Sequence, residues 1–429
     1  MSGELRRSGG RPVVWLLIAA GTLLVAWSLV VPAWGSPDEN NHWQYAAYVH
    51  AFGSLPAYNS HFVEANEPPL YYILMSPFAA TSYSSSLAVA PAVPPYPDIA
   101  PVNDLAKYLA LHEARLATCI LSLLTVLFAY LAGVEATGRR STGVLAGALV
   151  AFLPEFTYRG AMFSTDALVT TLCAAGTWLM VRLVRRGWRW REGIALALVG
   201  GLALLSKVTG ALLLAGAIVL VLSEPAVRWR LRSLAARAAS LAIAPLIALP
   251  WFLYMWVHYG DPIGAGAMNG AVGDLVAHHS LLSNYMVQVL PAEVYETFVL
   301  AIGRYDEFWA PLWVYAAYGG VMVVPLVGVW RLVRQRSEHL RLVAVLLVMF
   351  AGALAAVLVI NLSFTQPQGR YLLPALPALA VVGALGLEAT PGWREHAAAA
   401  TATIATLLGV ADLALMVGVV VPAFGGLHW

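Results

Sequence analysis

Long apolar runs recur along almost the whole sequence, and they constrain the fold more than any other feature. Of the 429 residues, 60% are hydrophobic and 11% are charged, whereas an ordinary soluble domain has roughly 25% charged residues. A run of about 20 apolar residues is long enough to cross the hydrocarbon core of a bilayer as a helix. The sequence therefore predicts an all-α polytopic protein, surrounded by membrane lipids, with a single membrane-embedded domain over residues 1–429.

We expect about eleven transmembrane helices, because that many apolar runs are separated by short polar connectors. The two shortest runs, 192–206 and 208–223, could instead form one broken pair. The other predicted spans are 13–34, 112–134, 143–159, 165–184, 236–257, 310–330, 341–361, 371–388 and 397–421.

The basic residues are distributed unevenly between the two ends of these spans. With the amino terminus in the cytoplasm, 19 of the 25 Lys and Arg residues fall on the inner side, as the positive-inside rule predicts. We therefore expect two large extracytoplasmic loops, 35–111 and 258–309, and no soluble domain after the last span. The first apolar run also fits a signal peptide, but its length favours an uncleaved anchor.

Composition and motifs disfavour several classes of function. The formal net charge is +2, and the arginines follow topology, so no nucleic-acid partner is expected. Cys119 and Cys173 lie inside apolar runs, which argues against a disulfide framework. Neither a P-loop nor a GxGxxG motif lies between a strand and a helix, so a nucleotide substrate is poorly supported. Four outer-loop histidines lack zinc-site spacing and are expected at the surface: His42, His61, His278 and His279.

The segment Ser36-Pro37-Asp38-Glu39-Asn40-Asn41-His42 follows the first span directly. Ser36 as N-cap, Pro37 at the first helical position and Glu39 three residues after Ser36 would form a capping box. Helical spacing would place Asp38 and His42 on one face. Capping alone explains the acids, but a rigid Asp38 at the lipid boundary could also act as a general base or hold a divalent cation. Glu39 is its candidate catalytic neighbour.

A second acid, Asp166, begins the predicted span at 165–184. Ser164 or Thr165 could cap that helix, which would make Asp166 a first-turn residue with a structural role. Acids at membrane depth are costly and usually face a cavity, which favours a function for Asp166. Glu155 and Arg159 lie one helical turn apart just before it and could form a local ion pair.

Two cations complement these acids. Lys207 lies between two short apolar runs, and Arg370 precedes Tyr371 at the start of the span at 371–388. Either cation could be an interfacial anchor whose charge reaches the head groups. Together with two acids at one membrane face, they suit a lipid phosphate whose attached group is transferred. We include Lys207, Arg370, Tyr371, Arg159 and His42 among the candidate substrate-binding residues.

Five motifs in order resemble the bacterial membrane-protein family designated domain of unknown function 2142. They cover residues 30–390 and include Pro37-Asp38-Glu39 with His42, Glu67-Pro68-Pro69-Leu70-Tyr71-Tyr72, Ser164-Thr165-Asp166 after Leu153-Pro154, Leu205-Ser206-Lys207-Val208-Thr209-Gly210, and Gln368-Gly369-Arg370-Tyr371-Leu372-Leu373-Pro374. That family is similar to the GT-C superfamily of membrane glycosyltransferases, which includes protein O-mannosyltransferases and aminoarabinose transferases.

The resemblance implies a GT-C-like bundle in the bacterial cytoplasmic membrane. It implies transfer of a sugar from a polyprenyl-phosphate donor to an extracytoplasmic acceptor, with inversion at the anomeric carbon. The first-loop acid of that superfamily corresponds to Asp38 and the second acid to Asp166; these two could share a Mg²⁺ or Mn²⁺ ion, or act without one. Lys207 and Arg370 would hold the donor phosphate. Two alternatives stay open: a lipid or glycan transporter, and a non-catalytic envelope-assembly subunit.

Overall fold

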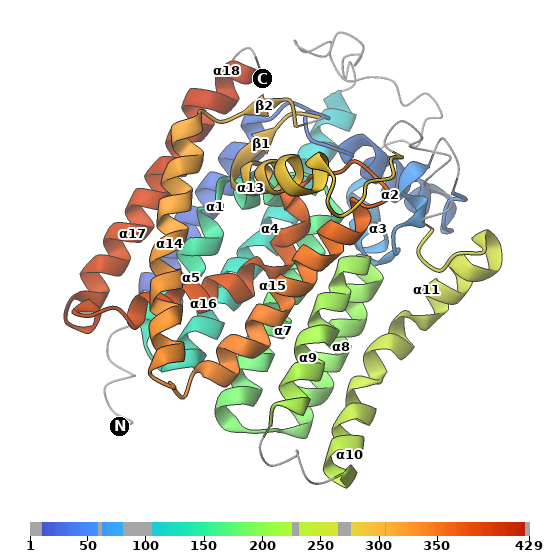
Figure 1. Cartoon of the computed structure of the whole chain (residues 1–429). Helices are drawn as coiled ribbons and strands as arrows, with labels where there is room; N and C mark the ends of the chain where they lie inside the picture. The colour runs from blue at the N-terminus through green and yellow to red at the C-terminus, as the bar shows by residue number, and fades with distance from the viewer. Residues whose placement is uncertain are drawn as a thin grey trace.

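The chain forms a mostly helical bundle that crosses the membrane several times (Figure 1). The computed structural model describes residues 11–58, 62–79, 105–224, 231–264, 276–304 and 306–424. Within these ranges, seven helices are long and apolar enough to cross a membrane, or eight if the bent pair α10–α11 forms one span. The long helices are α1 (Arg11–Val30), α4 (Leu105–Thr137), α7 (Thr165–Arg186), α14 (Leu312–Arg334), α15 (Leu340–Ile360), α16 (Leu376–Glu388) with the preceding 3-10 turn η7 (Gly369–Ala375), and α17 (Trp393–Leu415).

Shorter elements complete the bundle and its ends. The helices are α2 (Glu39–Phe52), α3 (Leu70–Met75), α5 (Arg140–Ala151), α6 (Pro154–Ala161), α8 (Trp190–Ser206), α9 (Ala211–Leu222), α10 (Leu231–Leu241), α11 (Ile243–Tyr259), α13 (Leu290–Leu300) and α18 (Val421–Ala423). Short 3-10 or π turns are η2 (Val63–Asn66), η3 (Ser76–Ala79), η4 (Val208–Gly210), η6 (Tyr285–Val289) and η8 (Met416–Val420).

The helical backbone breaks at two places within the predicted spans, once at a proline and once at a lysine. The predicted span 143–159 divides into α5 and α6, because Phe152 and Leu153 leave the helix and Pro154 starts a new one. The pair near 192–223 divides at Lys207, which is extended at φ −161° and ψ 147°. The predicted count of eleven spans is therefore higher than the seven or eight that pass on length and composition.

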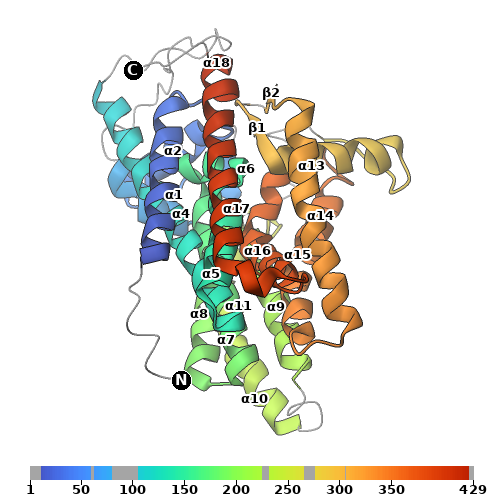
Figure 2. The same ribbon diagram turned by 90° about the vertical axis from the view of Figure 1, so that its left-hand side faces the viewer.

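Helices α4, α7 and α16 form the centre of the bundle (Figure 2). In the most apolar window of α7 and of Gly369–Glu388, 78% of the residues are buried, against 24% in α14 and 28% in Glu395–Ala423. The outer helices therefore face lipid. Cys119 and Cys173 are both free, and both lie in this packed interior.

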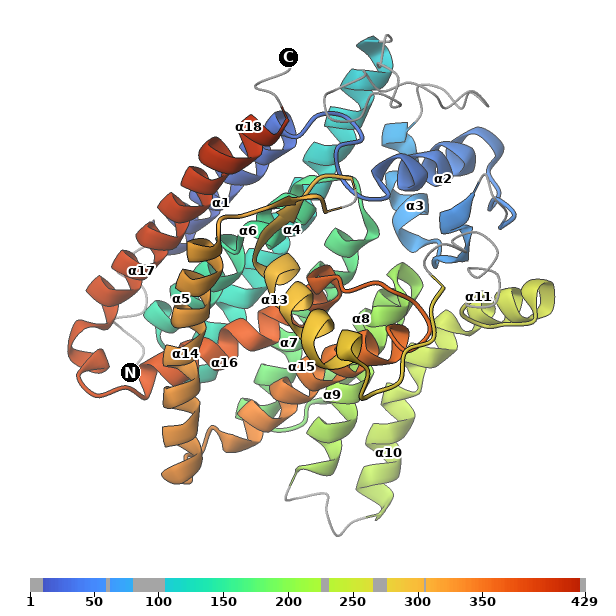
Figure 3. The ribbon, with the colours of Figure 1, turned by 45° about the horizontal axis from the view of Figure 1, so that its top comes forward.

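The short polar turns at the two ends of the bundle differ in character. The turns that follow α4, α7, α14 and α16 lie at one end, and several of the arginines assigned above to the inner side lie in these turns or in the adjoining helix ends (Figures 1 and 2). Elements α2, α3, α13 and the two strands lie at the other end (Figure 3). The separation of basic turns from the large loops agrees with the predicted topology, while the direction of insertion stays a prediction.

Two strand pairings organise the second large loop. Strand β1 (Ala301–Ile302) pairs antiparallel with β2 (Phe308–Trp309), with Ala301 opposite Trp309 and Ile302 opposite Phe308. A separate bridge joins Val276 to Phe364. The loop is thereby connected to the segment that leads into η7. Parts of the two predicted loops, residues 59–61 with His61, 80–104 and 265–275, lie outside the described residues.

One arginine joins the first helix, the first outer loop and the centre of the bundle. Arg115 of α4 is fully buried and uses all five of its N–H donors. Three of them donate to the carbonyl oxygens of Ser28, in the last turn of α1, and of Val31 and Pro32, directly after it. The last carbonyl groups of a helix have no partner within the helix, and Arg115 supplies one here. The other two form a bidentate ion pair with Glu39, with distances of 2.8 and 2.6 Å.

The capping box predicted at Ser36–Glu39 is wrong. Helix α2 begins at Glu39, and its N-cap is Asp38, whose side chain makes no capping hydrogen bond. Both Glu39 oxygens accept from Arg115, and they also accept the backbone N–H groups of Trp34 and Phe163 at 3.1 Å. The competing long-range ion pair is stronger than a solvent-exposed local cap, because these charges are fully buried.

Asp412, an acid inside α17, is also a structural residue. It is fully buried and accepts from Trp27 Nε1 at 3.1 Å and from Thr157 Oγ1 at 2.7 Å. The carboxylate thus joins α17 to α1 and α6. Because Trp27 is buried and held in this way, α1 is an integral part of the packed bundle.

Removing the Arg115 side chain tests this arrangement. We expect Arg115→Met to lower the free energy of unfolding by about 3–5 kcal/mol, since Glu39 would remain buried without its counter-ion. Thermal unfolding in detergent would detect the change as a lower Tm. Glu113→Met, an exposed position on the same helix, should stay within about 0.5 kcal/mol of the wild type. Equal Tm values for the two variants would contradict the central role of Arg115.

Candidate active site

Two ion pairs lie at the end of the bundle that carries α2 and α3; Asp166 and Arg370 are buried, and Asp38 and Lys207 are partly exposed. Asp38 Oδ2 accepts from Arg370 Nη2 at 2.8 Å, and Asp166 Oδ1 accepts from Lys207 Nζ at 2.7 Å. The four side chains come from four separate segments of the sequence. The structure therefore brings together the two acids and the two cations that the sequence analysis singled out.

Asp38 owes its position to an unusual backbone conformation. It lies immediately before α2 with φ 62° and ψ 0°, in the left-handed region. Aspartate and asparagine tolerate this region better than most residues. Trp34, four residues earlier, also has a positive φ of 64°. For a bulky residue such a conformation is strained, and strain of this kind clusters at functional sites.

The second acid is positioned by a helix start that the sequence predicted correctly. Ser164 is the N-cap of α7, and its hydroxyl accepts the backbone N–H of Asp166 at 3.3 Å. Lys207 approaches from the break between α8 and η4 and also donates to Thr165 Oγ1 at 3.3 Å. The break requires Gly210, because a Cβ there would lie 2.3 Å from the backbone carbon of Ala203.

Arg370 is held by the loop that precedes α16. Its Nε donates to Gln368 Oε1 at 2.7 Å. The adjacent Gly369 donates its N–H to Thr297 of α13 at 2.7 Å. A Cβ at Gly369 would lie 2.2 Å from the backbone nitrogen of Phe298, so only glycine permits this close approach. The hydrogen bonds of this loop and its close packing against α13 therefore fix the position of the Arg370 guanidinium.

Glu67 links the Asp166–Lys207 pair to α2 through a chain of contacts. One of its carboxylate oxygens lies 3.3 Å from Lys207 Nζ, and the other accepts from the Tyr72 hydroxyl at 3.1 Å. Tyr72 in turn lies 2.9 Å from His42 Nδ1. Because the tyrosine proton is directed to Glu67, its oxygen accepts from Nδ1–H of His42. That assigns the lone pair of the imidazole to Nε2.

A candidate metal site lies beside this chain. Ligand atoms of His42, Glu64 and Glu67 all come within 4.8 Å of one another. Glu64 lies in the 3-10 turn η2 and Glu67 is its C-cap, and side chains three residues apart in such a turn are eclipsed. One imidazole nitrogen and two carboxylates form a donor set suited to Zn²⁺ or Mn²⁺. The shared-ion prediction for Asp38 and Asp166 remains untested, and each of these acids already has a cationic side-chain partner.

The burial of this cluster alters how its groups titrate. Burial raises the pKa of Glu64 well above its ordinary value, and the negative charges of Asp38 and Glu67 act in the same direction. Burial lowers the pKa of His42 below 6.5, so its ring is neutral at pH 7. For Asp38, burial by itself would raise the pKa, but Arg370, His42 and Lys207 outweigh burial and hold the pKa below its ordinary value.

The prediction that His42 lies at the surface is wrong, because it is only 2% exposed. The reason is the packing of α3 against α2: the Tyr72 ring covers the imidazole at a centroid distance of 5.9 Å and stacks on Tyr45 at 3.7 Å. His278 is exposed as expected, whereas His279 is half-buried and stacks on Tyr285.

Arg159 belongs to a neighbouring buried group. The predicted pair with Glu155 is confirmed, at 2.6 Å, and Arg159 makes a second ion pair with Asp306 in the turn between β1 and β2. Its Nη1 has no hydrogen-bond partner among the described residues. The hydroxyl of Tyr371 donates to Gln366 at 2.7 Å, while its ring lies beside Arg370. Both residues thus border the ion pairs rather than join them.

The sequence analysis missed several residues of this site. Glu64 and Asp306 were not singled out, and Glu67 was noted only within a motif. An acid pair at i and i+3 near a Pro-Pro dipeptide is a weak signal for Glu64 and Glu67, since it requires knowing that the turn is 3-10. Asp306 lies in the turn between β1 and β2, 147 residues after Arg159 in the sequence. No local sequence pattern indicates that the two side chains meet.

Comparisons with known proteins agree with this architecture. Residues 106–254 match the family described as dolichyl-phosphate-mannose-protein mannosyltransferase. A search of curated proteins found no match. The resemblance to the domain of unknown function 2142 family stays a prediction.

Solved structures of two membrane transferases are similar to the whole chain. ArnT from Cupriavidus metallidurans bound to undecaprenyl phosphate is 15% identical, with a TM-score of 0.57, over 97% of this chain and 74% of that chain. The Archaeoglobus fulgidus oligosaccharyltransferase AglB, in complex with an inhibitory peptide and a dolichol-phosphate, is 14% identical, with a TM-score of 0.55, over 93% and 54%. A complex of the same oligosaccharyltransferase with Zn and sulfate gives 16% and 0.53, over 92% and 52%. The chain spans about half the length of that oligosaccharyltransferase. These likenesses show that the chain shares its fold with ArnT and with the oligosaccharyltransferase AglB.

Proposed function

We propose that this protein transfers a sugar from a polyprenyl-phosphate donor to an acceptor hydroxyl at the membrane face that carries α2 and α3. The observation that carries the proposal is the closeness of the Asp38–Arg370 and Asp166–Lys207 ion pairs, each of which lies within electrostatic reach of the other. The structures of ArnT with undecaprenyl phosphate and of AglB with a dolichol-phosphate support this donor class. From the distribution of the arginines, we place this face on the extracytoplasmic side of the bacterial cytoplasmic membrane.

The donor phosphate would bind between the two cations. Lys207 and Arg370 are both largely buried near the lipid boundary, where a charge–phosphate contact is stronger than in water. In the free protein each cation already contacts a carboxylate. A phosphate would therefore compete with Asp38 for Arg370 and with Asp166 for Lys207. Donor binding becomes an exchange of anionic partners.

This exchange would prepare Asp38 to act as a base. While Arg370 is 2.8 Å away, the pKa of Asp38 stays below its ordinary value and the carboxylate is a weak base. When the phosphate takes over Arg370, the pKa of Asp38 rises. Asp38 would then accept the proton of the acceptor hydroxyl as that oxygen attacks the anomeric carbon. The bond from this carbon to the phosphate oxygen breaks, the lipid phosphate leaves, and the configuration inverts.

A divalent cation would fit at His42, Glu64 and Glu67. The acids around the ion pairs exceed the cations, because Asp38, Asp166 and Glu67 face only Lys207 and Arg370. Burial raises the pKa of Glu64, and the negative charges of Asp38 and Glu67 raise it further. When bound, a metal ion supplies positive charge that offsets an incoming phosphate. His42 Nε2 and the two glutamates are the residues that would hold it.

The two alternatives are weaker. A transporter usually carries ionisable residues near the middle of the membrane. Asp412 is a buried acid inside a span, but both of its carboxylate oxygens accept hydrogen bonds that join α17 to α1 and α6. A non-catalytic assembly subunit would need neither the strained Asp38 nor the paired cations, although it could retain the bundle.

Turnover with labelled polyprenyl-phosphate sugars tests the function directly. We expect purified protein to release free polyprenyl phosphate in the presence of the right acceptor, and Asp38→Asn to reduce transfer by about 10²–10⁴-fold through loss of the base. Asparagine keeps the left-handed backbone of Asp38 accessible, so the Tm of the variant should be preserved. Unchanged transfer by Asp38→Asn would refute the base assignment. No lipid phosphate release with any donor would favour the alternatives.

Replacing Arg370 tests the phosphate site separately. We expect Arg370→Gln to weaken binding of polyprenyl phosphate by roughly 10-fold or more, because a charge-assisted contact is lost. Binding of labelled polyprenyl phosphate to protein in nanodiscs measures the effect. Arg331→Gln, in the last turn of α14 at the opposite end, is the matched control and should bind as the wild type does. A similar affinity for both variants would place the phosphate elsewhere.

Metal binding is expected to depend on pH. Because the pKa of Glu64 is raised, protons compete with a cation for this carboxylate at a higher pH than usual, so affinity for Zn²⁺ or Mn²⁺ should fall as the pH decreases. Calorimetry in buffers of different ionisation enthalpy would show proton release. We expect Glu64→Gln to weaken binding by at least the roughly 10–100-fold typical of an outer-shell loss, and His278→Gln to leave it unchanged. Unaltered affinity in Glu64→Gln would exclude this ligand set.

A further inference from the structure

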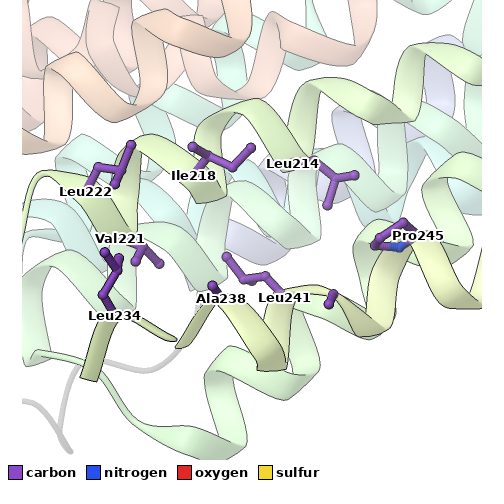
Figure 4. A pocket seen from close by; sticks show the side chains of 9 residues that line it. Leu214, Ile218, Val221, Leu222, Leu234, Ala238, Leu241 and Pro245 are labelled. Carbon is purple, nitrogen blue, oxygen red and sulfur yellow. The ribbon is translucent and has the colours of Figure 1, made fainter. Parts of the chain in front are cut away.

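An apolar groove lies between α9 and the α10–α11 pair, toward the end of the bundle opposite the candidate active site. It encloses about 260 Å³. Figure 4 shows side chains of the helices facing each other across it. Leu214, Ile218 and Leu222 come from α9, and Leu234, Ala238 and Pro245 from the α10–α11 pair. The lining is almost wholly apolar, so its natural occupant is a hydrocarbon chain.

The length of the groove corresponds to one leaflet. Leu214 and Leu222 are eight residues apart on α9, which amounts to about 12 Å along a helix. Half of the hydrocarbon core of a bilayer is about 15 Å thick. The groove is also open to the lipid side, since Ile218 is 54% and Leu222 is 57% exposed. A single acyl chain of a phospholipid therefore fits along it.

Positive charge is concentrated at the end of the groove near Leu222. Glu224, two residues after Leu222, forms an ion pair with Arg237 of α10 and lies 3.8 Å from Arg341 of α15. Two arginines thus share one carboxylate, which leaves an excess positive charge. Arg237 also lies over the Trp188 ring, 5.1 Å from its centroid. Tryptophan and arginine in this combination are typical of the head-group level.

From these observations we infer that the groove binds an anionic phospholipid of the leaflet opposite the candidate active site. One acyl chain lies between α9 and α10, and the head-group phosphate contacts Arg237 and Arg341. A donor lipid tail is a less suitable occupant. Lys207 lies seven residues before Leu214, about 10 Å above the upper end of the groove, so a tail would have to cross that distance first.

Native mass spectrometry of the full chain with added phosphatidylglycerol or phosphatidylcholine of identical acyl chains tests this site. We expect phosphatidylglycerol to bind several-fold more tightly. Ala238→Phe fills the groove and should abolish this binding. Ala239→Phe is the matched control, because Ala239 is an exposed alanine on the same helix outside the lining, and it should bind as the wild type does.

A second pair of variants separates the site from general charge attraction. Arg237→Gln should reduce the preference for phosphatidylglycerol by roughly five-fold, the effect of about one basic residue near a head group. Arg232→Gln, an exposed arginine on the same helix, should leave it unchanged. Equal losses in both variants, or equal binding of the two lipids, would overturn the proposal. So would displacement of phosphatidylglycerol by stoichiometric polyprenyl phosphate, which would assign the groove to the donor tail.

Discussion

The buried ion pair between Arg115 and Glu39 is the interaction on which the candidate site depends. Arg115 completes the C-terminal end of α1, while Glu39 begins α2 and accepts the backbone N–H of Phe163. Asp38 immediately precedes Glu39, and Asp166 follows Phe163 by three residues. Both candidate acids therefore extend from segments fixed by the same pair. In a low dielectric a pair with all its hydrogen bonds made permits little alternative geometry.

The two cations are placed by a different device, which is interruption of helices. Lys207 is an extended residue between α8 and η4, and Arg370 lies in the 3-10 turn η7. Irregular backbone at membrane depth is tolerated where it is buried in protein or lines a cavity. At both breaks a glycine allows backbone to approach backbone, Gly210 against α8 and Gly369 against α13. The breaks are thus built by packing, and they present the cations to the acids.

The sequence predicted the parts of this site that local patterns encode. Apolar runs indicated the bundle, the cap at Ser164 indicated the start of α7, and isolated charges indicated Lys207 and Arg370. It failed where a distant partner decides the outcome. Glu39 matched a capping box, yet its partner is 76 residues away. No local rule ranks a buried arginine on another helix above a nearby serine, and the energetic advantage appears only once the tertiary packing is known.

The arrangement of charges also bears on how a donor could be recognised. Carboxylates hold Lys207 and Arg370 in place before any ligand binds, so the cations are preorganised, and their desolvation is already compensated in the free protein. A phosphate that replaces one carboxylate then needs no new burial of a cation. The released carboxylate, however, loses its positive partner, and its pKa therefore rises. In the reaction proposed above, the acceptor hydroxyl would supply the proton that this carboxylate takes up, so phosphate recognition and base activation would follow from the same exchange.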